Sequence, residues 1–290
     1  MTAFRTRFAP SPTGILHLGH AFSALTAFTA ARRCSGRFLL RIEDIDRTRC
    51  RPEFEAAIYE DLAWLGIEWE TPVRRQSAHF SEYDAALARL IDMGVVYRCF
   101  KTRKEVLDEI ARAPHLSANG PEGPVFIGAP LTKKEEAALI AAGAPFAWRL
   151  SISRSRQLLG TRFYSLSFVV EKYAPPHAQT CVAARPDIFG DVVIARKDAG
   201  TSYHLASVHD DALQGVTHVI RGEDLAAAAH LHTLLQALFD WPRPIYRHHR
   251  LITDEGGRRL AKRDRSATLR SFRDRGERPE DVRRRLGFSD

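Results

Sequence analysis

A short stretch near the start of the chain combines two histidines with a pattern that suits phosphate binding. The run Arg7–His20 reads RFAPSPTGILHLGH, and its prolines and glycine predict a turn between a strand and a helix. His17 and His20 lie three residues apart at the expected helix start, so their side chains share a face. A helix N-terminus carries about half a positive charge and free N–H groups, and imidazoles there can donate to phosphate oxygens. Gly19 has no side chain, which leaves room for a flat ring such as adenine.

The elements that must position these residues alternate between strands and helices. Arg5–Phe8 is a short strand-like run before the turn, and Gly19–Arg33 has the apolar spacing of a helix. Arg37–Ile42 (RFLLRI) is expected to be a buried strand. Pro52 opens a second amphipathic helix, and a similar apolar stripe runs over Phe80–Ile91. This alternation predicts an α/β fold with a parallel sheet.

The alternation is interrupted in the middle of the chain. Four prolines and three glycines fall within Arg112–Leu131, which predicts an irregular loop or insertion. Strand-like runs return at Ile188–Ala195 and Val216–Ile220, and Leu225–Phe239 has a helical pattern. We therefore expect an α/β domain interrupted by an inserted lobe.

Composition and charge narrow the class of protein. The chain has 290 residues, 44% of them hydrophobic and 27% charged, as is usual for a globular protein. We expect no signal peptide, because the N-terminal run MTAFRTRF has no apolar h-region, and no membrane span, because no apolar run approaches about 18 residues. The scattered cysteines suit free thiols in a reducing cytoplasm, where we expect the protein to be. They are Cys34, Cys50, Cys99 and Cys181.

Positive charge is concentrated in the last part of the chain. The net charge is +8, and the segment from Arg243 to Asp290 has 15 Lys and Arg residues against 8 Asp and Glu. A one-sided basic surface favours a polyanion partner such as a nucleic acid. A solvated, arginine-rich tail explains the same numbers, so charge alone leaves both interpretations open.

Four sequence motifs resemble those of class I aminoacyl-tRNA synthetases of the glutamyl type, and they occur in the same order as in that family. Arg7–His20 resembles the HIGH-motif region in its Phe-Ala-Pro-Ser-Pro-Thr-Gly form, and Arg41–Arg49 (RIEDIDRTR) resembles a second motif. Tyr203–Asp224 resembles a third, and Arg259–Arg263 (RLAKR) resembles a degenerate KMSKS loop. The resemblance implies an ATP-dependent ligase.

The resemblance also implies the architecture. We expect a Rossmann-like, doubly wound parallel sheet, an inserted α/β lobe and a short basic helical piece at the C-terminus. The expected catalytic domain comprises residues 1–92 and 186–242, and the acceptor-binding-like lobe comprises residues 93–185. Residues 243–290 would hold the KMSKS-like loop and the basic segment.

The pocket implied by the resemblance suits glutamate, which has two carboxylates and one ammonium group. Arg7 and Arg221 would bind the carboxylates through their planar guanidinium groups. Glu43 would hold the ammonium, and Tyr203 and Ser11 would add hydrogen bonds. Which arginine meets which carboxylate stays open.

Two acidic segments allow other roles. The charged residues over 41–47 would also suit a surface salt-bridge network without catalytic function. Asp210 and Asp211 would suit nucleotide contacts or the capping of a helix.

Glutamate activation joins the amino-acid α-carboxylate to the α-phosphate of ATP and releases pyrophosphate, so positioning and charge neutralisation dominate. The resemblance places His17 and His20 at the phosphates and Lys262 at the departing pyrophosphate. It also places Pro10 and Gly19 at the ATP. Mg²⁺ would arrive with the nucleotide.

The chain departs from the glutamyl enzymes in its length. Only 27 residues follow Arg263, which is too few for their anticodon-binding domain. This plan resembles glutamyl-queuosine tRNA(Asp) synthetases, which glutamylate queuosine in the anticodon of tRNA(Asp). The expected partners are L-glutamate, ATP and queuosine-modified tRNA(Asp), with no membrane contact, and we expect a monomer.

A second departure concerns zinc. Related enzymes often have a Cys-x-Cys pair after a tyrosine in the lobe, whereas this chain has Cys99 and then Lys101. One thiol and the distant His115 are too few ligands for a structural zinc site, so we predict that zinc is absent and that packing alone holds the lobe. A third departure is Ala261 and Arg263 in the KMSKS-like loop.

Three alternatives compete with this hypothesis. One is a short paralogue that charges tRNA(Glu) with a helper protein. Another is a HIGH-type nucleotidyltransferase acting on a small metabolite, which the basic C-terminus and the pocket residues argue against. The last is an RNA-binding protein without catalysis, which His17, His20 and Lys262 argue against.

Overall fold

The computed structural model describes residues 3–112, 119–173, 175–196, 200–252 and 268–288. Its first sheet contains β1 (Arg5–Phe8), β2 (Arg37–Ile42) and β3 (Glu70–Arg75), all parallel and in the order β1-β2-β3. α1 (Leu18–Arg33) connects β1 to β2, and α2 (Pro52–Trp64) connects β2 to β3. These are the crossovers expected of a parallel sheet.

A second group of strands extends this sheet on the other side of β1. It has the order β11-β12-β8-β9, in which the first three strands are parallel and β9 is antiparallel. Its strands are β8 (Ser167–Glu171), β9 (Gln179–Ala183), β11 (His218–Gly222) and β12 (Ile245–His249). The residue before β11 lies beside β1, because Thr217 N donates to Arg5 O at 2.9 Å and Arg5 N donates to Thr217 Oγ1 at 2.8 Å. The strand order therefore reverses between β1 and β11, where a doubly wound sheet binds its ligands.

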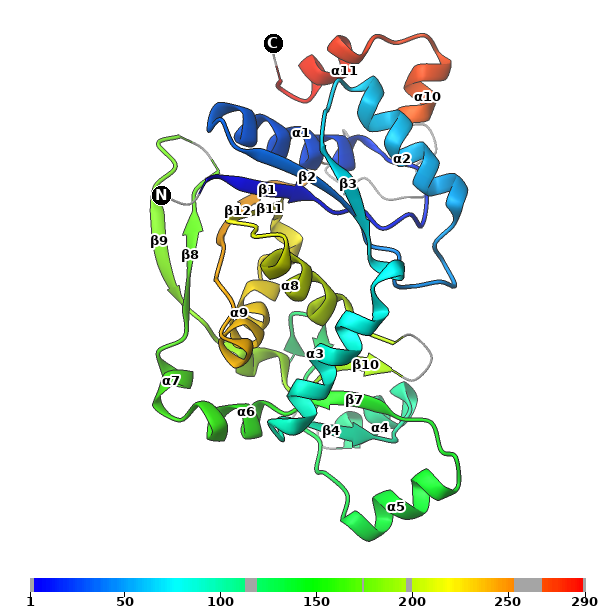
Figure 1. Ribbon diagram of the computed structural model, residues 1–290, viewed down its shortest axis with the longest axis vertical. Coiled ribbons are helices and arrows are strands. Elements are labelled where there is room, and N and C mark those ends of the chain that lie inside the picture. The colour runs from blue at the N-terminus through cyan, green and yellow to red at the C-terminus, as the bar shows by residue number, and fades with distance from the viewer. Residues whose placement is uncertain (1–2, 113–118, 174, 197–199, 253–267, 289–290) are drawn as a thin grey trace.

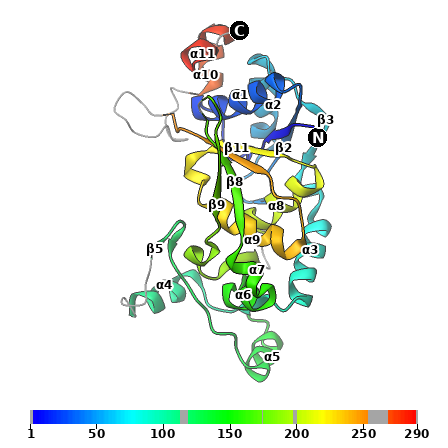
Figure 2. The ribbon, with the colours of Figure 1, turned by 90° about the vertical axis from the view of Figure 1, so that its left-hand side faces the viewer.

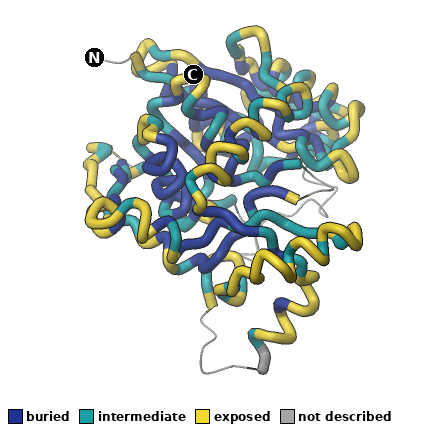
Figure 3. Tube along the Cα trace, turned by 60° about the horizontal axis from the view of Figure 1, so that its bottom comes forward, coloured by how far each residue is buried: buried dark blue, intermediate teal, exposed yellow. Residues whose placement is uncertain are grey.

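Helices cover both faces of this sheet (Figure 1). α1 and α2 pack on one face, where Leu25, Leu40 and Ile58 are among the buried residues of one core. α8 (Tyr203–Leu213) and α9 (Ala228–Phe239) lie on the opposite face (Figure 1). Figure 3 shows the buried residues gathered in the body of the molecule, with exposed segments around them.

The inserted lobe is built on a small antiparallel sheet of order β10-β7-β4 (Figure 1). Its strands are β4 (Val96–Cys99), β7 (Ala147–Leu150) and β10 (Val192–Arg196), and its hairpin is β5 (Asn119–Gly120) and β6 (Gly123–Pro124). The helices between or before these strands are α3 (Phe80–Asp92), α4 (Arg103–Arg112), α5 (Lys133–Ala141), α6 (Ile152–Leu159) and α7 (Thr161–Tyr164).

Strand pairing does not follow the boundary that we expected at residue 185. β8 and β9 fall in the range expected for the lobe but pair with β12 or with each other, whereas β10 falls in the range expected for the catalytic domain but pairs with β7. The division of the chain into three parts otherwise stays a prediction.

One buried carboxylate joins several segments of the lobe. Asp191 is 3% exposed, and its Oδ2 accepts from the Tyr97 hydroxyl at 2.9 Å and from Gly128 N at 3.0 Å. Its Oδ1 accepts from Ile152 N at 3.0 Å. The carboxylate thus links β4, the loop after the hairpin and the start of α6.

The closing helices pack on the body. α10 (Leu269–Asp274) and α11 (Pro279–Arg285) lie beside α2 (Figure 1). Their buried side chains join the core beneath α1, and Arg273 Nη1 donates to Asp61 Oδ1 at 2.9 Å. Several further arginines here pair locally with Glu277 or Asp281, so part of the basic surplus is neutralised within the segment. Among the helices of the described residues, none is both long and apolar enough to cross a membrane.

Candidate active site

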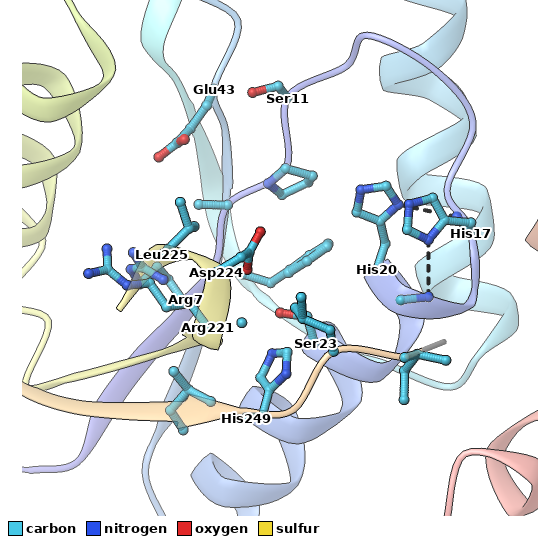
Figure 4. Close-up of a pocket in the computed structure, with 18 of the residues that line it drawn as sticks. Arg7, Ser11, His17, His20, Ser23, Glu43, Arg221, Asp224, Leu225 and His249 are labelled. Atoms are coloured by element: carbon cyan, nitrogen blue, oxygen red, sulfur yellow. Dashed lines mark hydrogen bonds between the residues drawn. The ribbon is translucent and has the colours of Figure 1, made fainter. Parts of the chain in front are cut away.

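A pocket of about 310 Å³ opens at the carboxyl ends of β1, β2, β11 and β12 (Figure 4). It lies where the strand order reverses, which is the usual ligand position in an open α/β sheet. Every predicted site residue that the structure describes lines it. These are Arg7, Pro10, Ser11, His17, Gly19, His20, Glu43, Tyr203 and Arg221.

Two buried arginines meet at one end of the pocket. Arg7, at the end of β1, donates from Nε to Asp211 Oδ1 at 3.0 Å. Arg221, on β11, donates from Nη1 to the Tyr203 hydroxyl at 3.4 Å. The Nε and Nη2 atoms of Arg221 are buried and have no hydrogen-bond partner within the described part of the chain. An unpaired buried guanidinium edge is costly by itself, and a ligand carboxylate would satisfy it.

A third arginine, Arg41, holds the acidic residue of the pocket. Its side chain is fully buried, and it donates to Glu43 Oε1 at 3.0 Å and to Asp211 Oδ1 at 2.7 Å. Burial raises the pKa of the Glu43 carboxyl, although the charges of Arg41 and Arg7 act in the opposite direction. Glu43 is therefore fixed at the wall of the pocket by a buried ion pair. The hypothesis of a surface network over residues 41–47 is wrong for Arg41 and Glu43, whose pair is internal.

The adjacent aspartates also have internal roles. Asp210 Oδ1 accepts from Arg74 Nε at 2.8 Å, and its Oδ2 accepts from the Tyr83 hydroxyl at 2.9 Å. Asp211 joins the Arg7 and Arg41 side chains, as described above. Neither aspartate lines the pocket, and the N-cap of α8 is Ser202. The structure therefore supports neither of the two roles that the sequence left open for these residues.

The two histidines form the N-terminal cap of α1. His17 is the N-cap residue, and its Nδ1 accepts from Gly19 N at 3.1 Å. Its backbone N–H donates to His20 Nδ1 at 3.2 Å, and the ring centroids lie 3.8 Å apart. Because each Nδ1 accepts a hydrogen bond, each neutral ring carries its hydrogen on Nε2. The helix cap thus sets the tautomer that presents an Nε2–H donor.

Gly19 lies close against the side chain of the first histidine. A Cβ atom built at Gly19 would lie 2.9 Å from Cε1 of His17, too close for a real side chain. The adenine contact that we expected at Gly19 stays a prediction.

Lys262 lies outside the described residues, but described residues that precede and follow its segment lie at or beside the pocket. Ile252, before the segment, lines the pocket. Thr268, after it, pairs with His17 in a β-bridge, and Leu269 N donates to Leu16 O at 2.9 Å. The role of Lys262 stays a prediction.

Comparison with known proteins agrees with this geometry. The family model "tRNA synthetases class I (E and Q), catalytic domain" matches residues 3–289. The chain belongs to this family. The protein is therefore an ATP-dependent ligase of the aminoacyl-tRNA synthetase type, and the recognition from the four motifs is confirmed.

Individual relatives agree with the family. Glutamyl-Q tRNA(Asp) synthetase of Rhodobacter capsulatus is 46% identical over 288 residues, which cover 98% of this chain and 99% of that protein. Its counterpart in Nocardia farcinica is 38% identical, with 95% and 81% covered. Glutamate–tRNA ligase of Aquifex aeolicus is 36% identical, with 97% of this chain and 56% of that protein covered.

The fold is also confirmed by a solved structure. Glutamate-tRNA synthetase from Elizabethkingia anophelis has a TM-score of 0.71 and 28% identity over 90% of this chain, and the match covers 53% of that protein. This synthetase chain thus spans about half the length of the glutamate–tRNA ligases that it matches.

Some pocket residues of this synthetase were missed from the sequence. Ser23 lines the pocket one helix turn after Gly19, so the spacing of α1 could have identified it. His249 projects from the end of β12 beside Ser23 (Figure 4). Its Nδ1–H donates to Arg250 O at 2.9 Å, and its buried Nε2 has no partner among the described residues. No sequence signal marked His249, because the run IYRHH resembles any buried strand.

In the part of the chain that the structure describes, no group of three or more His, Cys, Asp or Glu side chains could hold a metal ion. His115 lies outside the described residues, and the absence of zinc stays a prediction.

Proposed function

We propose that this protein activates L-glutamate with ATP to form glutamyl-adenylate and transfers the glutamyl group to queuosine in the anticodon of tRNA(Asp). The observation that carries the acceptor is the match to the Rhodobacter capsulatus glutamyl-Q tRNA(Asp) synthetase, which spans almost the whole of both chains. The pocket supports glutamate as the amino acid, because Arg7, Arg221 and the Glu43 carboxylate line it together.

Glutamate would bind between Arg7, Arg221 and Glu43. The unpaired Nε and Nη2 atoms of Arg221 support a two-point contact with one ligand carboxylate. Arg7 supplies the second cation, and Glu43 accepts from the ammonium group. Glutamine would leave a charged guanidinium with a neutral partner, so it would bind more weakly.

In the activation step, an oxygen of the α-carboxylate forms a bond to the α-phosphorus of ATP while the bond to the β-phosphate oxygen breaks. His17 and His20 would donate from Nε2–H to phosphate oxygens, and Lys262 would neutralise the departing pyrophosphate. Mg²⁺ would enter with ATP and neutralise its phosphate charge. The protein itself holds the two substrates in line.

In the transfer step, a hydroxyl of the queuosine cyclopentenediol attacks the acyl carbon of the adenylate. An ester bond forms, AMP leaves, and the hydroxyl proton passes to solvent. The unpaired bases of an anticodon loop can be splayed out into a protein pocket, which makes queuosine accessible. The closing helices would contact phosphates with those arginines that are not paired locally.

Two assays test the proposal. Amino-acid-dependent ATP–pyrophosphate exchange, run without RNA over all standard amino acids, should respond to glutamate alone; equal exchange with glutamine or aspartate would refute the pocket assignment. Radiolabelled glutamate should then label tRNA(Asp) from cells that make queuosine, but neither tRNA(Asp) from cells that lack it nor tRNA(Glu). Labelling of tRNA(Glu) alone would favour the tRNA(Glu)-charging paralogue instead.

A further inference from the structure

A relay of three hydrogen-bonded polar side chains, Glu122, His204 and His232, connects the inserted lobe with the catalytic body, and its two histidines are buried. His204 on α8 and His232 on α9 are 6% and 2% exposed. His204 Nδ1 lies 3.2 Å from His232 Nε2, and His204 Nε2 lies 2.8 Å from Glu122 Oε1. Glu122 belongs to the turn between β5 and β6, and Figure 2 shows β5 on the lobe. These three residues lie outside the pocket lining given above.

The partners determine where the hydrogens lie. A carboxylate only accepts, so His204 donates from Nε2 to Glu122. One hydrogen then lies between His204 Nδ1 and His232 Nε2. Burial, together with the charge of Arg221, holds the pKa of His232 well below its usual range, so this ring is neutral. Glu122 thus fixes the orientation of His204, and His204 fixes that of His232.

The two histidines of the relay contact a residue that lines the pocket. The Tyr203 ring lies against both imidazoles, with centroid distances of 5.4 Å to His204 and 5.8 Å to His232. The Tyr203 hydroxyl accepts the hydrogen bond from Arg221 Nη1. The orientation of the two histidines therefore limits where Tyr203, and with it the Arg221 guanidinium, can lie.

The position of Glu122 depends on close packing of the β5–β6 hairpin against the segment before β10. A Cβ atom at Gly120 would lie 2.3 Å from Ile188 O, so only glycine permits this approach. Phe126 forms a β-bridge with Gly190 just after the hairpin. Displacing the hairpin would withdraw Glu122 from His204.

We propose that Glu122, His204 and His232 are positioning residues for the glutamate pocket, so that affinity for glutamate depends on the docking of the β5–β6 hairpin. This inference rests on the proposed function, since glutamate is the ligand concerned. The Glu122 side chain is 55% exposed, so its removal perturbs the relay at little cost to folding.

The kinetic test replaces Glu122 with alanine and measures pyrophosphate exchange. KM for glutamate should rise roughly three- to tenfold, a usual size for coupling through packed and hydrogen-bonded residues, while kcat and KM for ATP stay within about twofold. Glu136→Ala is the matched control, because Glu136 pairs with Arg98 in the same lobe, away from α8. An unchanged KM for glutamate, or an equal rise in KM for ATP, overturns the proposal.

A second variant tests the connection through the histidine. His204→Phe keeps a ring against Tyr203 but removes both nitrogens, so it should raise KM for glutamate by a similar factor. Adding Glu122→Ala to it should not raise KM for glutamate further, since both changes break the same relay. Independent, multiplying effects would overturn the proposal.

A spectroscopic measurement separates this proposal from the function on which it rests. Nitrogen-15 NMR of labelled histidines should show a hydrogen-bonded Nε2–H on His204 that is lost in Glu122→Ala. This readout requires no enzymatic activity, so a wild-type protein that fails to activate glutamate would refute the function and leave the relay testable. A His204 signal that is the same in both proteins overturns the relay.

Discussion

Replacing Arg221 with methionine separates ligand binding from packing in the pocket. The guanidinium is buried, lies 5.2 Å over the Tyr246 ring, and has two nitrogen atoms without a partner in the described structure. Methionine fills a similar volume without a charge. We therefore expect the variant to lose glutamate affinity while keeping or gaining stability, because an unpaired buried charge is removed.

The size of each effect follows from the two unpaired nitrogens. A hydrogen bond to a charged group contributes about 1.5–3 kcal/mol, so the loss of two weakens glutamate binding by about 3–6 kcal/mol. At about 1.4 kcal/mol per tenfold, KM for glutamate should rise by roughly 10²- to 10⁴-fold. The free energy of unfolding should stay equal or rise by about 1 kcal/mol.

The assays are glutamate-dependent pyrophosphate exchange and urea unfolding. Arg247→Met is the control, because Arg247 on the neighbouring strand is also buried but is paired with Glu171. Removing it leaves the buried Glu171 carboxylate without its charged partner, which should lower the free energy of unfolding by about 3 kcal/mol. An Arg221→Met protein whose KM stays within about threefold of the wild-type value, less than the loss of one charged hydrogen bond, would show that Arg221 does not bind glutamate.

Four further predictions follow from the site and the lobe. His20→Ala should lower the exchange rate by about 10²-fold or more while the Kd for ATP, measured by calorimetry, changes much less, because its Nε2–H acts on the transition state; equal losses in both would contradict this. Asp191→Asn should lower the free energy of unfolding in urea by roughly 1–3 kcal/mol, and elemental analysis of wild-type protein should find no stoichiometric zinc. Burial would raise the pKa of Asp210, but the His209 hydrogen bond and the Arg41 charge outweigh it and lower the pKa to about 2. Since the folded pKa lies below the unfolded value, this carboxylate contributes about 2 kcal/mol at neutral pH, which is lost as pH falls from about 4 through 2; thermal melts of Asp210→Asn should lack this part of the pH dependence.

Helices and strands of the catalytic body could be predicted where the spacing of apolar residues alone determines the type of element. Arg37–Ile42 is the strand that the sequence indicated, and the first helix starts one residue before Gly19. The strand expected over Ile188–Ala195 begins only at Val192, because Gly190 has a positive φ of 64° and ends a short 3-10 helix there. Such a turn competes with the strand pattern locally and is not visible in hydrophobicity.

The predicted residues that line the pocket belong to recognisable motifs, whereas His249 and the interactions that orient the site could not be predicted. Arg41 and Asp211 are 170 positions apart and form the ion pair that places Glu43. Neither composition nor spacing specifies which buried charges meet across such a distance. The same limit explains why β8 could not be assigned to the sheet of β12 from the sequence.

The packing of the closing helices on the body predicts that a cut in the chain before them would leave the two parts together. Leu269, Phe272, Val282 and Leu286 are buried against the body, and each buried apolar side chain contributes roughly 1.5–3 kcal/mol. The backbone of Leu269 is also bonded to Leu16 beside the capping histidines. A protein nicked between residues 252 and 268 should therefore elute as one particle in gel filtration, as two fragments that stay associated. The two pieces, expressed separately and mixed, should then associate, which gel filtration of the mixture can show.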